Sequence, residues 1–398
     1  MRFTGFLFSS IFLIGLLGCS ESGNKKEPLK WKRGEVYENV AVEKDTTLSY
    51  ALYFPSDYSA DGKNKALFFF DAHARGVLPV ERYQALAEKY HVALFGSNQM
   101  KNGLTTKERN RIITHFLQDA ERRFHIDQNQ LFTAGFSGGA RVAALVALYN
   151  QNVKGVIGCG AGFPQVRKPV NQHFVWVGIV GNRDFNYLEM KNLYSQLRLL
   201  DKPAFLLSFD GKHEWPPEAV MDEAFQILFR NRTNDLLYGI ENGMTLTDLD
   251  RREITLRDAL VRNFTEKDSI WWRDEIQALN KKRDDLSNKD EALMNARLLS
   301  YLGMVSYLFC NSAVKTEDDQ KLRQCLYIYR MVEPENPDRY YFQAVYEAHR
   351  KNYDKAITLL KKAVSLGLEE PSKILSEKAF EPLKEDPAFN ELLNSSQK

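Results

Sequence analysis

Between residues 34 and 230, short and continuously apolar segments alternate with longer amphipathic ones. Unbroken apolar runs predict strands covered on both faces, and strands that alternate with helices predict a mainly parallel sheet. The predicted strands follow a hairpin at residues 37–54 and lie at residues 66–71, 92–98, 130–137, 153–160, 174–181 and 204–211. The predicted helices lie at residues 80–90, 107–124, 138–149, 187–200 and 217–230. The sequence therefore predicts an α/β domain.

One strand end carries a distinctive motif, Gly135-Phe-Ser-Gly-Gly139, which matches G-x-S-x-G between a predicted strand and a predicted helix. Chemistry in parallel sheets collects beyond the carboxyl ends of the strands. Glycines suit this place because a sharp strand-to-helix turn leaves little room for side chains beside a nucleophile. The following helix N-terminus supplies amide N–H groups and a positive dipole. The motif predicts that Ser137 is a nucleophile, with a simple helix N-cap as the alternative.

A nucleophilic serine needs a base, and the chain offers few candidates. Of the 7 histidines, only His173, His213 and His349 follow Ser137. His173 begins a predicted strand on the side away from the expected site, and His349 lies in a helical region. His213 lies in the loop after the last predicted strand, where a base is expected. A satisfied surface histidine is the alternative interpretation.

The base in turn needs an orienting carboxylate. Asp184 follows the strand at 174–181 at its carboxyl end, and Asp210 is the competitor just before His213. We expect Asp184 to be the acid and Asp210 to end its strand or support the turn. A turn aspartate is the alternative role for Asp184. Ser137, Asp184 and His213 then follow one another in the order Ser, Asp, His.

The segments GFSGGARVA, VGIVGNRDFNY and SFDGKHEWPP together resemble the α/β-hydrolase superfamily over about residues 40–230. Within it they are similar to lid-less esterases of the polyhydroxybutyrate-depolymerase and feruloyl-esterase type. The resemblance implies that Ser137 is the nucleophile, His213 the general base and acid, and Asp184 its orienting carboxylate. Such a mechanism calls for no cofactor and no metal.

The resemblance also implies an oxyanion hole, built from the N–H of Gly138 and a second N–H from the loop at 71–76. Relatives have His-Gly in this loop, whereas this chain has His73-Ala74. An alanine can donate its N–H if the turn does not need a positive φ. We therefore expect Ala74 to be the second donor, with Arg75 as the alternative.

The surroundings of the triad give weaker signals about the substrate. Phe136, Phe185 and Trp215 flank the triad positions and are expected to line a substrate pocket, although core packing explains aromatic residues equally well. The short connection between the strands at 153–160 and 174–181 predicts an open cleft suited to bulky or polymeric esters. The helical region could still shade it.

Residues 231–398 contain no apolar runs typical of strands, and their charged, amphipathic pattern predicts helices. Residues 338–367 resemble a tetratricopeptide repeat, and residues 290–336 a degenerate second unit. The large and small positions of the repeat are taken by Tyr340, Ala344, Tyr353, Ala356 and Ala363. A generic helical bundle is the alternative. Such repeats form concave surfaces, which predicts a protein partner.

Composition excludes some classes of function. The formal charge is 54 − 52 = +2 without a long basic run, which argues against a nucleic-acid partner. Three cysteines lie within the predicted domains: Cys159 in an apolar strand, and Cys310 and Cys325 on helices. An odd number gives no full disulfide framework, and no spacing suggests a metal site. Cys310 and Cys325 are expected either to pair or to be buried as small hydrophobic residues.

The N-terminus predicts export. Arg2 precedes an apolar stretch at 6–17 that is short for a membrane span but suits a signal peptide. Leu16-Leu17-Gly18-Cys19 resembles the bacterial lipobox, which implies a signal peptide at 1–19, lipidation of Cys19 and a tether at 20–33. An ordinary secretory signal is the alternative. Ser20 favours the outer membrane over the inner by its resemblance to lipoprotein sorting signals.

The leading hypothesis is a serine esterase anchored in the bacterial cell envelope, with a hydrolase domain at 34–230 and a repeat-like helical domain at 231–398. Its substrate would be a small-molecule or polymer-linked ester. The competing hypotheses are a serine peptidase on the same fold, and a binding lipoprotein whose hydrolase core is inactive.

Overall fold

The computed structural model describes residues 31–60, 62–164, 172–229, 246–368 and 371–395. The predicted signal peptide, Cys19 and all of the tether before residue 31 lie outside the described residues. The predicted boundary at residues 230 and 231 lies outside them as well. Within the described ranges, no helix is both long enough and apolar enough to cross a membrane.

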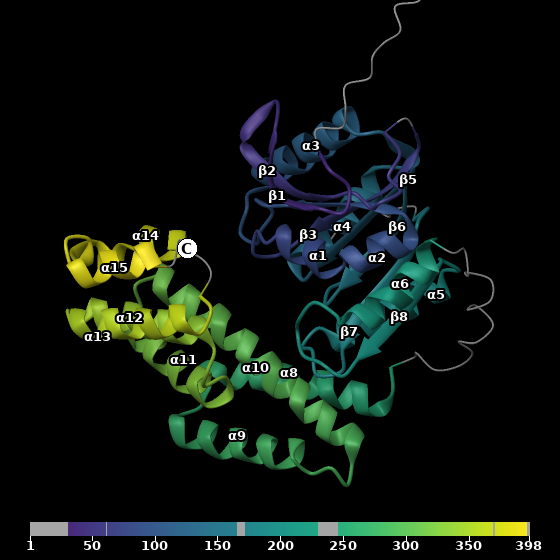
Figure 1. The fold of residues 1–398 in the computed structure, drawn as a ribbon. Helices are drawn as coiled ribbons and strands as arrows, with labels where there is room; N and C mark the ends of the chain where they lie inside the picture. The colour runs from purple at the N-terminus through teal and green to yellow at the C-terminus, as the bar shows by residue number, and fades with distance from the viewer. Residues whose placement is uncertain (1–30, 61, 165–171, 230–245, 369–370, 396–398) are drawn as a thin grey trace, which may run out of the picture. The chain divides into compact units, whose positions relative to one another are not determined.

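An eight-stranded sheet forms the first half of the described chain, in the strand order β1-β2-β4-β3-β5-β6-β7-β8 (Figure 1). The strands β1 and β2 form an antiparallel hairpin, β2 also runs antiparallel to β4, and all pairings from β4 to β8 are parallel. The hairpin and the mainly parallel sheet confirm the fold predicted from the apolar runs. The bounds of the strands are β1 Val36–Val42, β2 Asp45–Tyr53, β3 Asn64–Phe70, β4 Val92–Ser97, β5 Ile126–Phe136, β6 Val153–Cys159, β7 Val175–Gly181 and β8 Ala204–Phe209.

Helices cover both faces of the sheet, which is why its strands are apolar on both sides. Successive residues of a strand point to opposite faces. In β3, Phe69 packs with the core formed by α1, α2 and α6, whereas Phe68 contacts Phe116 of α3, with ring centroids 5.4 Å apart. The helices of this part are α1 Val77–Arg82, α2 Gln84–Tyr90, α3 Thr106–Arg123, α4 Gly138–Tyr149, α5 Tyr187–Leu199 and α6 Glu218–Phe229.

The single helix expected at 80–90 is wrong, because Tyr83 divides it into α1 and α2. Tyr83 has φ −115° and ψ 17°, outside the helical region. Its side chain is fully buried, and its hydroxyl donates to the carbonyl of Pro216 at 2.7 Å. A tertiary hydrogen bond therefore accompanies a local break that the amphipathic pattern does not reveal.

The second half of the described chain is helical, as predicted, and has its own apolar core. Its helix starts are well capped: Thr247 forms a capping box with Asp250, and Pro337 occupies the first turn of α12 after the cap Asn336. The bounds are α8 Asp248–Glu266, α9 Ser269–Arg283, α10 Lys289–Lys315, α11 Asp319–Val332, α12 Pro337–His349, α13 Tyr353–Ser365, α14 Pro371–Ser376, the 3-10 helix η1 Lys378–Leu383 and α15 Pro387–Ser395.

Small residues lie where α12 and α13 approach each other. Ala344, Ala356 and Ala363 are all fully buried. Consecutive helices with small buried residues are compatible with the repeat resemblance, which stays a prediction. The structure shows the state of three cysteines: Cys159, Cys310 and Cys325 are buried free thiols. Burial raises the pKa of the Cys310 thiol, and a hydrogen bond with Cys325 adds to the effect.

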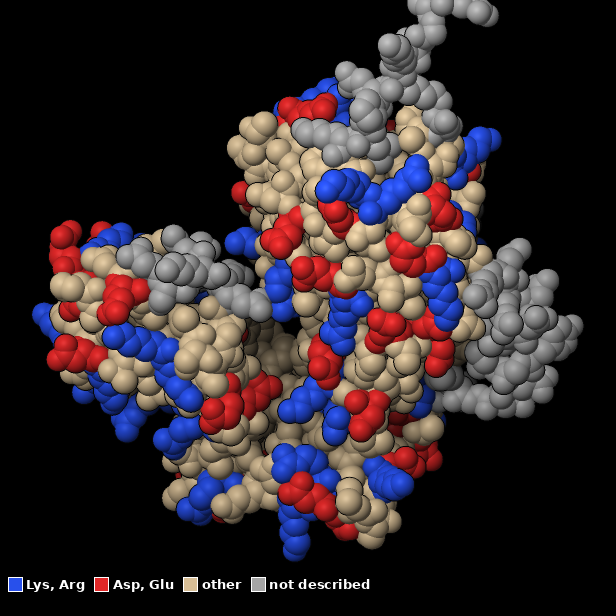
Figure 2. Space-filling model, in the orientation of Figure 1, with Lys and Arg blue, Asp and Glu red and all other residues tan. Residues whose placement is uncertain are grey.

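Charges are spread over the surface without a large patch of one sign on the face drawn in Figure 2, where Lys and Arg alternate with Asp and Glu. The mixture of signs on this face agrees with the nearly balanced formal charge of +2. This face therefore does not create a strong long-range field toward polyanions.

Candidate active site

Ser137 lies at the turn between β5 and α4, with φ 54° and ψ −120°. Residues other than glycine rarely adopt this backbone conformation, and such strain is concentrated at functional sites. The N–H of Ser137 donates to the carbonyl of Cys159 at the end of β6, at 2.8 Å. The strained turn is thus tied to the neighbouring strand.

The glycines on either side of Ser137 are required by close backbone contacts. A Cβ on Gly135 would lie 2.2 Å from the carbonyl oxygen of Gly139, and a Cβ on Gly139 would lie 2.0 Å from that of Phe70. A Cβ on Gly138 would lie 1.8 Å from Oδ1 of Asn102. The motif therefore holds the turn by removing side chains that the backbone could not accommodate.

Ser137, His213 and Asp184 come together as a hydrogen-bonded chain at the carboxyl ends of β5, β7 and β8. Nε2 of His213 lies 2.9 Å from Oγ of Ser137. Nδ1 of His213 lies 3.0 Å from Oδ1 and 2.9 Å from Oδ2 of Asp184. The Asp184 side chain is 1% exposed and also accepts the N–H of Asn186 at 2.7 Å. The geometry suits proton transfer from the serine hydroxyl to the imidazole, with the carboxylate holding the ring.

The competing residues lie elsewhere. The Asp210 side chain is 79% exposed and pairs with Arg183 at 3.2 Å. His349 contacts Asp319 at 2.6 Å in the helical half. Both ring nitrogens of His173 are buried and lack a hydrogen-bond partner among the described residues. Of the candidates weighed from the sequence, the structure thus brings only His213 and Asp184 to Ser137.

The expectation that Ala74 donates the second oxyanion N–H is wrong. Its N–H already donates to the carbonyl of Met100 at 2.9 Å. Its φ is 63°, so the turn does need the left-handed conformation that an alanine adopts at a cost. The oxyanion role of the Gly138 N–H stays a prediction; α4 begins at this residue, and the first N–H groups of a helix have no intrahelical acceptor.

Asp71 holds the loop at 71–76, and the sequence argument did not single it out. Its fully buried carboxylate accepts from the N–H of His73 at 2.7 Å, Nε of Arg75 at 3.0 Å and Nε1 of Trp215 at 2.8 Å. Burial alone would raise the pKa of Asp71, but these hydrogen bonds outweigh it and lower the pKa to about 2. An acidic residue at the end of an unbroken apolar run was the signal that could have revealed it.

The aromatic residues near the triad have two different roles. Phe136 and Trp215 are each 3% exposed and belong to the core, so the expectation that they line the substrate pocket is wrong. Phe185 does line the cavity, as expected. The rings of Phe136 and Phe185 pack against the His213 imidazole, with centroids 4.7 and 4.2 Å from it. Core packing of Phe136 therefore contributes to the placement of the base.

A cavity of about 980 Å³ is lined by Ser137 and His213, together with residues from both halves of the described chain. The sheet side contributes Ser137, His213 and Phe185, together with Asn102 beside Gly138. The helical side contributes α10, with Tyr301, Met304, Tyr307 and Leu308. The helices thus form one wall of the cleft that the short strand connection predicts to be open. No group of His, Cys, Asp or Glu suited to a metal ion occurs among the described residues.

No family model matches the sequence, and no curated protein matches it. Solved structures resemble its α/β part. An S-formylglutathione hydrolase from Staphylococcus aureus is 14% identical over 47% of this chain and 90% of its own, with a TM-score of 0.38. Esterase B from Lactobacillus rhamnosis is 14% identical over 52% and 89%, with a TM-score of 0.42. An esterase from Pyrobaculum calidifontis is 12% identical over 52% and 87%, with a TM-score of 0.38.

The sheet order and the strand–serine–helix turn define the fold class, an α/β-hydrolase domain followed by helices. The class is the one that the sequence predicted. A fold of this kind hosts many activities, so function has to be argued from the site.

Proposed function

We propose that this protein is an exported, membrane-anchored serine hydrolase that cleaves carboxylic esters through an acyl-enzyme. The observation that carries the proposal is the unbroken chain from Oγ of Ser137 through His213 to Asp184, with contacts of 2.9 Å on each side of the imidazole. It occurs at a strained turn, at the start of a helix and inside a cavity. These are the parts that nucleophilic acyl transfer needs.

In the proposed reaction, Nε2 of His213 takes the proton of Ser137 as Oγ attacks the ester carbonyl. Asp184 keeps the imidazole in the orientation that accepts this proton and stabilises the imidazolium that forms. The N–H of Gly138 and the positive end of α4 stabilise the negative charge on the carbonyl oxygen. His213 then returns the proton to the departing alcohol. A water molecule, activated in the same way, releases the acid and restores Ser137.

The cavity supports a bulky or polymer-linked ester as substrate. Its volume of about 980 Å³ exceeds what a short acyl ester needs, and α10 adds aromatic and aliphatic side chains to its wall. Anchoring through Cys19 at the cell envelope is inferred from the sequence at residues 1–19 alone. A lipid on Cys19 would hold the enzyme near polymeric substrates of the envelope.

The test compares the soluble chain, residues 20–398, with its Ser137→Ala variant on p-nitrophenyl esters of increasing acyl length. Loss of a triad serine is expected to lower kcat by a factor on the order of 10⁴–10⁶. A fluorophosphonate probe should label the wild type at Ser137 and leave the variant unlabelled. If the wild type neither turns over esters nor reacts with the probe, the hydrolase proposal fails. A binding role for the helical half then becomes the better hypothesis.

A further inference from the structure

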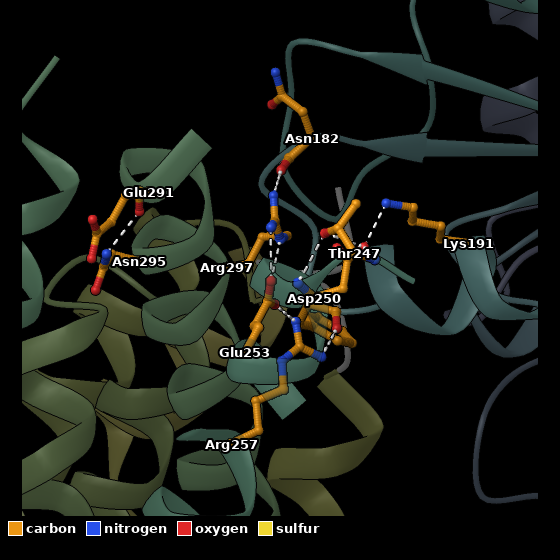
Figure 3. A network of polar contacts seen from close by, with 10 residues as sticks. Asn182, Lys191, Thr247, Asp250, Glu253, Arg257, Glu291, Asn295 and Arg297 are labelled. Carbon is orange, nitrogen blue, oxygen red and sulfur yellow. Dashed lines mark hydrogen bonds and ion pairs between the residues drawn. The ribbon is translucent and has the colours of Figure 1, made fainter. Parts of the chain in front are cut away.

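The loop that carries Asp184 is held by two arginines from the helical half of the chain. Nη1 of Arg297 in α10 donates to the carbonyl of Asn182 at 3.1 Å, as Figure 3 shows. Nη1 of Arg257 in α8 donates to the carbonyl of Phe185 at 2.7 Å. One of these carbonyls precedes Asp184 in the loop and the other follows it. The backbone on both sides of the proposed catalytic acid is therefore fixed from α8 and α10.

Both arginines are oriented by one carboxylate, that of Glu253 in α8 (Figure 3). Oε2 of Glu253 accepts from Nε of Arg297 at 2.9 Å and from its Nη2 at 2.7 Å, while Oε1 accepts from Nη2 of Arg257. Glu253 is 0% exposed, Arg297 5% and Arg257 9%. The planar guanidinium of Arg297 is held at two nitrogens, which leaves a third aimed at the loop.

The loop that carries Asp184, residues 182–186, is called the acid loop below. A second ion pair joins α8 to α5, the helix that follows this loop. Nζ of Lys191 in α5 contacts Oδ2 of Asp250 at 2.6 Å, and both groups are largely buried (Figure 3). The same Asp250 carboxylate accepts from the N–H of Thr247 at 2.7 Å and so closes the N-terminus of α8. The start of α8 is thus attached to the α/β half at a point separate from Arg257 and Arg297.

A buried Arg–Glu–Arg cluster is a costly way to hold helices together. Removing three charged groups from water carries a large penalty, and apolar residues of similar volume often give equal or greater stability. Apolar residues, however, cannot donate hydrogen bonds to the carbonyls of Asn182 and Phe185. Besides joining the helices, the cluster therefore supplies hydrogen-bond donors, held in fixed positions, to the backbone carbonyls of the acid loop.

We propose that Glu253, through Arg257 and Arg297, is a positioning residue that keeps Asp184 aligned with His213. The helical half would then be part of the hydrolase machinery and not only a separate module. This inference rests on the proposed function, because it assigns Asp184 the role of orienting carboxylate. A misplacement of about 1 Å at a catalytic group can cost on the order of 10²-fold in rate.

The experiment uses two ways of removing the cluster in the chain of residues 20–398. Glu253→Gln removes the shared carboxylate, and the triple variant Arg257→Met/Glu253→Leu/Arg297→Met replaces all three charges by apolar groups. If Glu253→Gln fails to fold, the triple variant carries the test. In a folded variant we expect kcat to fall roughly 10- to 100-fold while KM for a short ester changes less than about twofold.

Glu347→Gln is the matched control. Glu347 is 6% exposed and pairs with Lys355 at 2.7 Å in the helical half, so the substitution also breaks an ion pair with a buried carboxylate. We expect it to leave kcat unchanged. An equal fall in kcat in Glu347→Gln would show that any loss of an ion pair in the helices disturbs the enzyme, and would overturn the proposal.

A double-mutant cycle separates positioning from general destabilisation. If Glu253 acts through Asp184, Glu253→Gln should cost no further activity in an Asp184→Ala background. A similar loss of kcat in both backgrounds would contradict the proposal. The cycle is measured on the residual turnover of the purified variants.

A readout without substrate keeps this inference distinct from the proposed function. The proton between Nδ1 of His213 and Asp184 gives a low-field NMR resonance when the two groups are well aligned. We expect this resonance to shift or broaden in both cluster variants and to stay unchanged in Glu347→Gln. If the wild type shows no turnover and no probe labelling, the proposed function fails and the resonance still decides the positioning. An unchanged resonance in both cluster variants overturns it.

Discussion

The turn at Ser137 and the loop at Asp184 both place a triad residue, but by different means. The Ser137 turn is held within the sheet, since Gly135 and Gly139 allow backbone contacts that any side chain would block, the latter with Phe70 of β3. The Asp184 loop is held by Arg257 and Arg297, whose contacts in the loop lie 72 and 115 positions earlier in the chain. One element is held by strands of the same sheet, whereas the other depends on a part of the chain with a different architecture.

The α/β half and the helical half both contribute to the proposed active site. The helices supply one wall of the cavity through α10 and the donors that hold the acid loop. Damage to the helices should therefore act on the acid, whereas damage to the turn should act on the nucleophile and on the sheet beneath it.

The largest effect is expected from Asp184→Asn. The amide can no longer hold the tautomer of His213 that accepts the serine proton, so kcat should fall by a factor of about 10⁴ with little change in folding. Ester hydrolysis is measured beside Asp210→Asn, whose 79% exposed carboxylate pairs with Arg183 and Asn182 rather than with His213 and should be dispensable. A comparable loss in Asp210→Asn would show that the wrong acid has been assigned.

Gly139→Ala should come next, with an effect on folding as well as on rate. Its Cβ would lie 2.0 Å from the carbonyl oxygen of Phe70, a backbone atom that cannot rotate away. We expect the free energy of unfolding to fall by about 3 kcal/mol in urea denaturation. The control is Gly103→Ala, where φ is +81° but nothing lies within 4 Å of the added Cβ. That variant should lose only about 1 kcal/mol from backbone strain.

Asp71→Asn should have a smaller effect that depends on pH. The pKa of Asp71 is about 2 in the folded protein, below its ordinary value of 3.8. Its contribution to stability is therefore fully present above about pH 4 and is lost as the pH falls through about 2. The wild type should exceed the variant in unfolding free energy by about 2 kcal/mol more at pH 5 than at pH 2. An advantage that does not change between these pH values would contradict the assignment.

The smallest effect is expected at the helical wall of the cavity. Leu308 lines the cavity and is 53% exposed, so Leu308→Ala should leave folding intact. With a bulky ester, KM should rise roughly fivefold, since about 1 kcal/mol of apolar contact is removed. A short ester should be unaffected. Leu286→Ala is the control, because Leu286 is 75% exposed and does not line this cavity. Equal KM values for wild type and Leu308→Ala on bulky esters would exclude α10 from substrate contact.

Several elements of the site could be predicted from the sequence because they depend on local periodicity or on backbone space. The apolar runs marked the parallel strands, since both faces of each strand are covered. The glycines of residues 135–139 marked the turn, since only small residues fit it. Of the histidines that follow Ser137, His213 is the one in a loop directly after a strand. This position predicted the base, because the carboxyl ends of parallel strands meet at one edge of the sheet.

Other elements were decided by contacts between distant parts of the chain. The N–H of Ala74, which has a left-handed conformation, is taken by the carbonyl of Met100, a contact that the loop sequence does not indicate. Trp215 is buried in the core, where the carboxylate of Asp71, far earlier in the chain, accepts its indole N–H. The family resemblance predicted Ala74 as an oxyanion donor, and proximity to His213 in the sequence predicted Trp215 in the substrate pocket. Contacts with distant residues exclude both roles.

The α/β fold class, the turn at Ser137 and the order of the three triad residues can be predicted from the amino-acid sequence, because hydrophobic periodicity and small residues at a turn are properties of short segments. The groups that hold the acid loop and the side chains that line the cavity come from residues far apart in the chain, so they appear only in the folded molecule. Nothing in the sequence distinguishes Arg297, Arg257 and Glu253 from ordinary charged residues of amphipathic helices. Their role follows from burial, which turns surface charges into a hydrogen-bonded cluster directed at the backbone around Asp184.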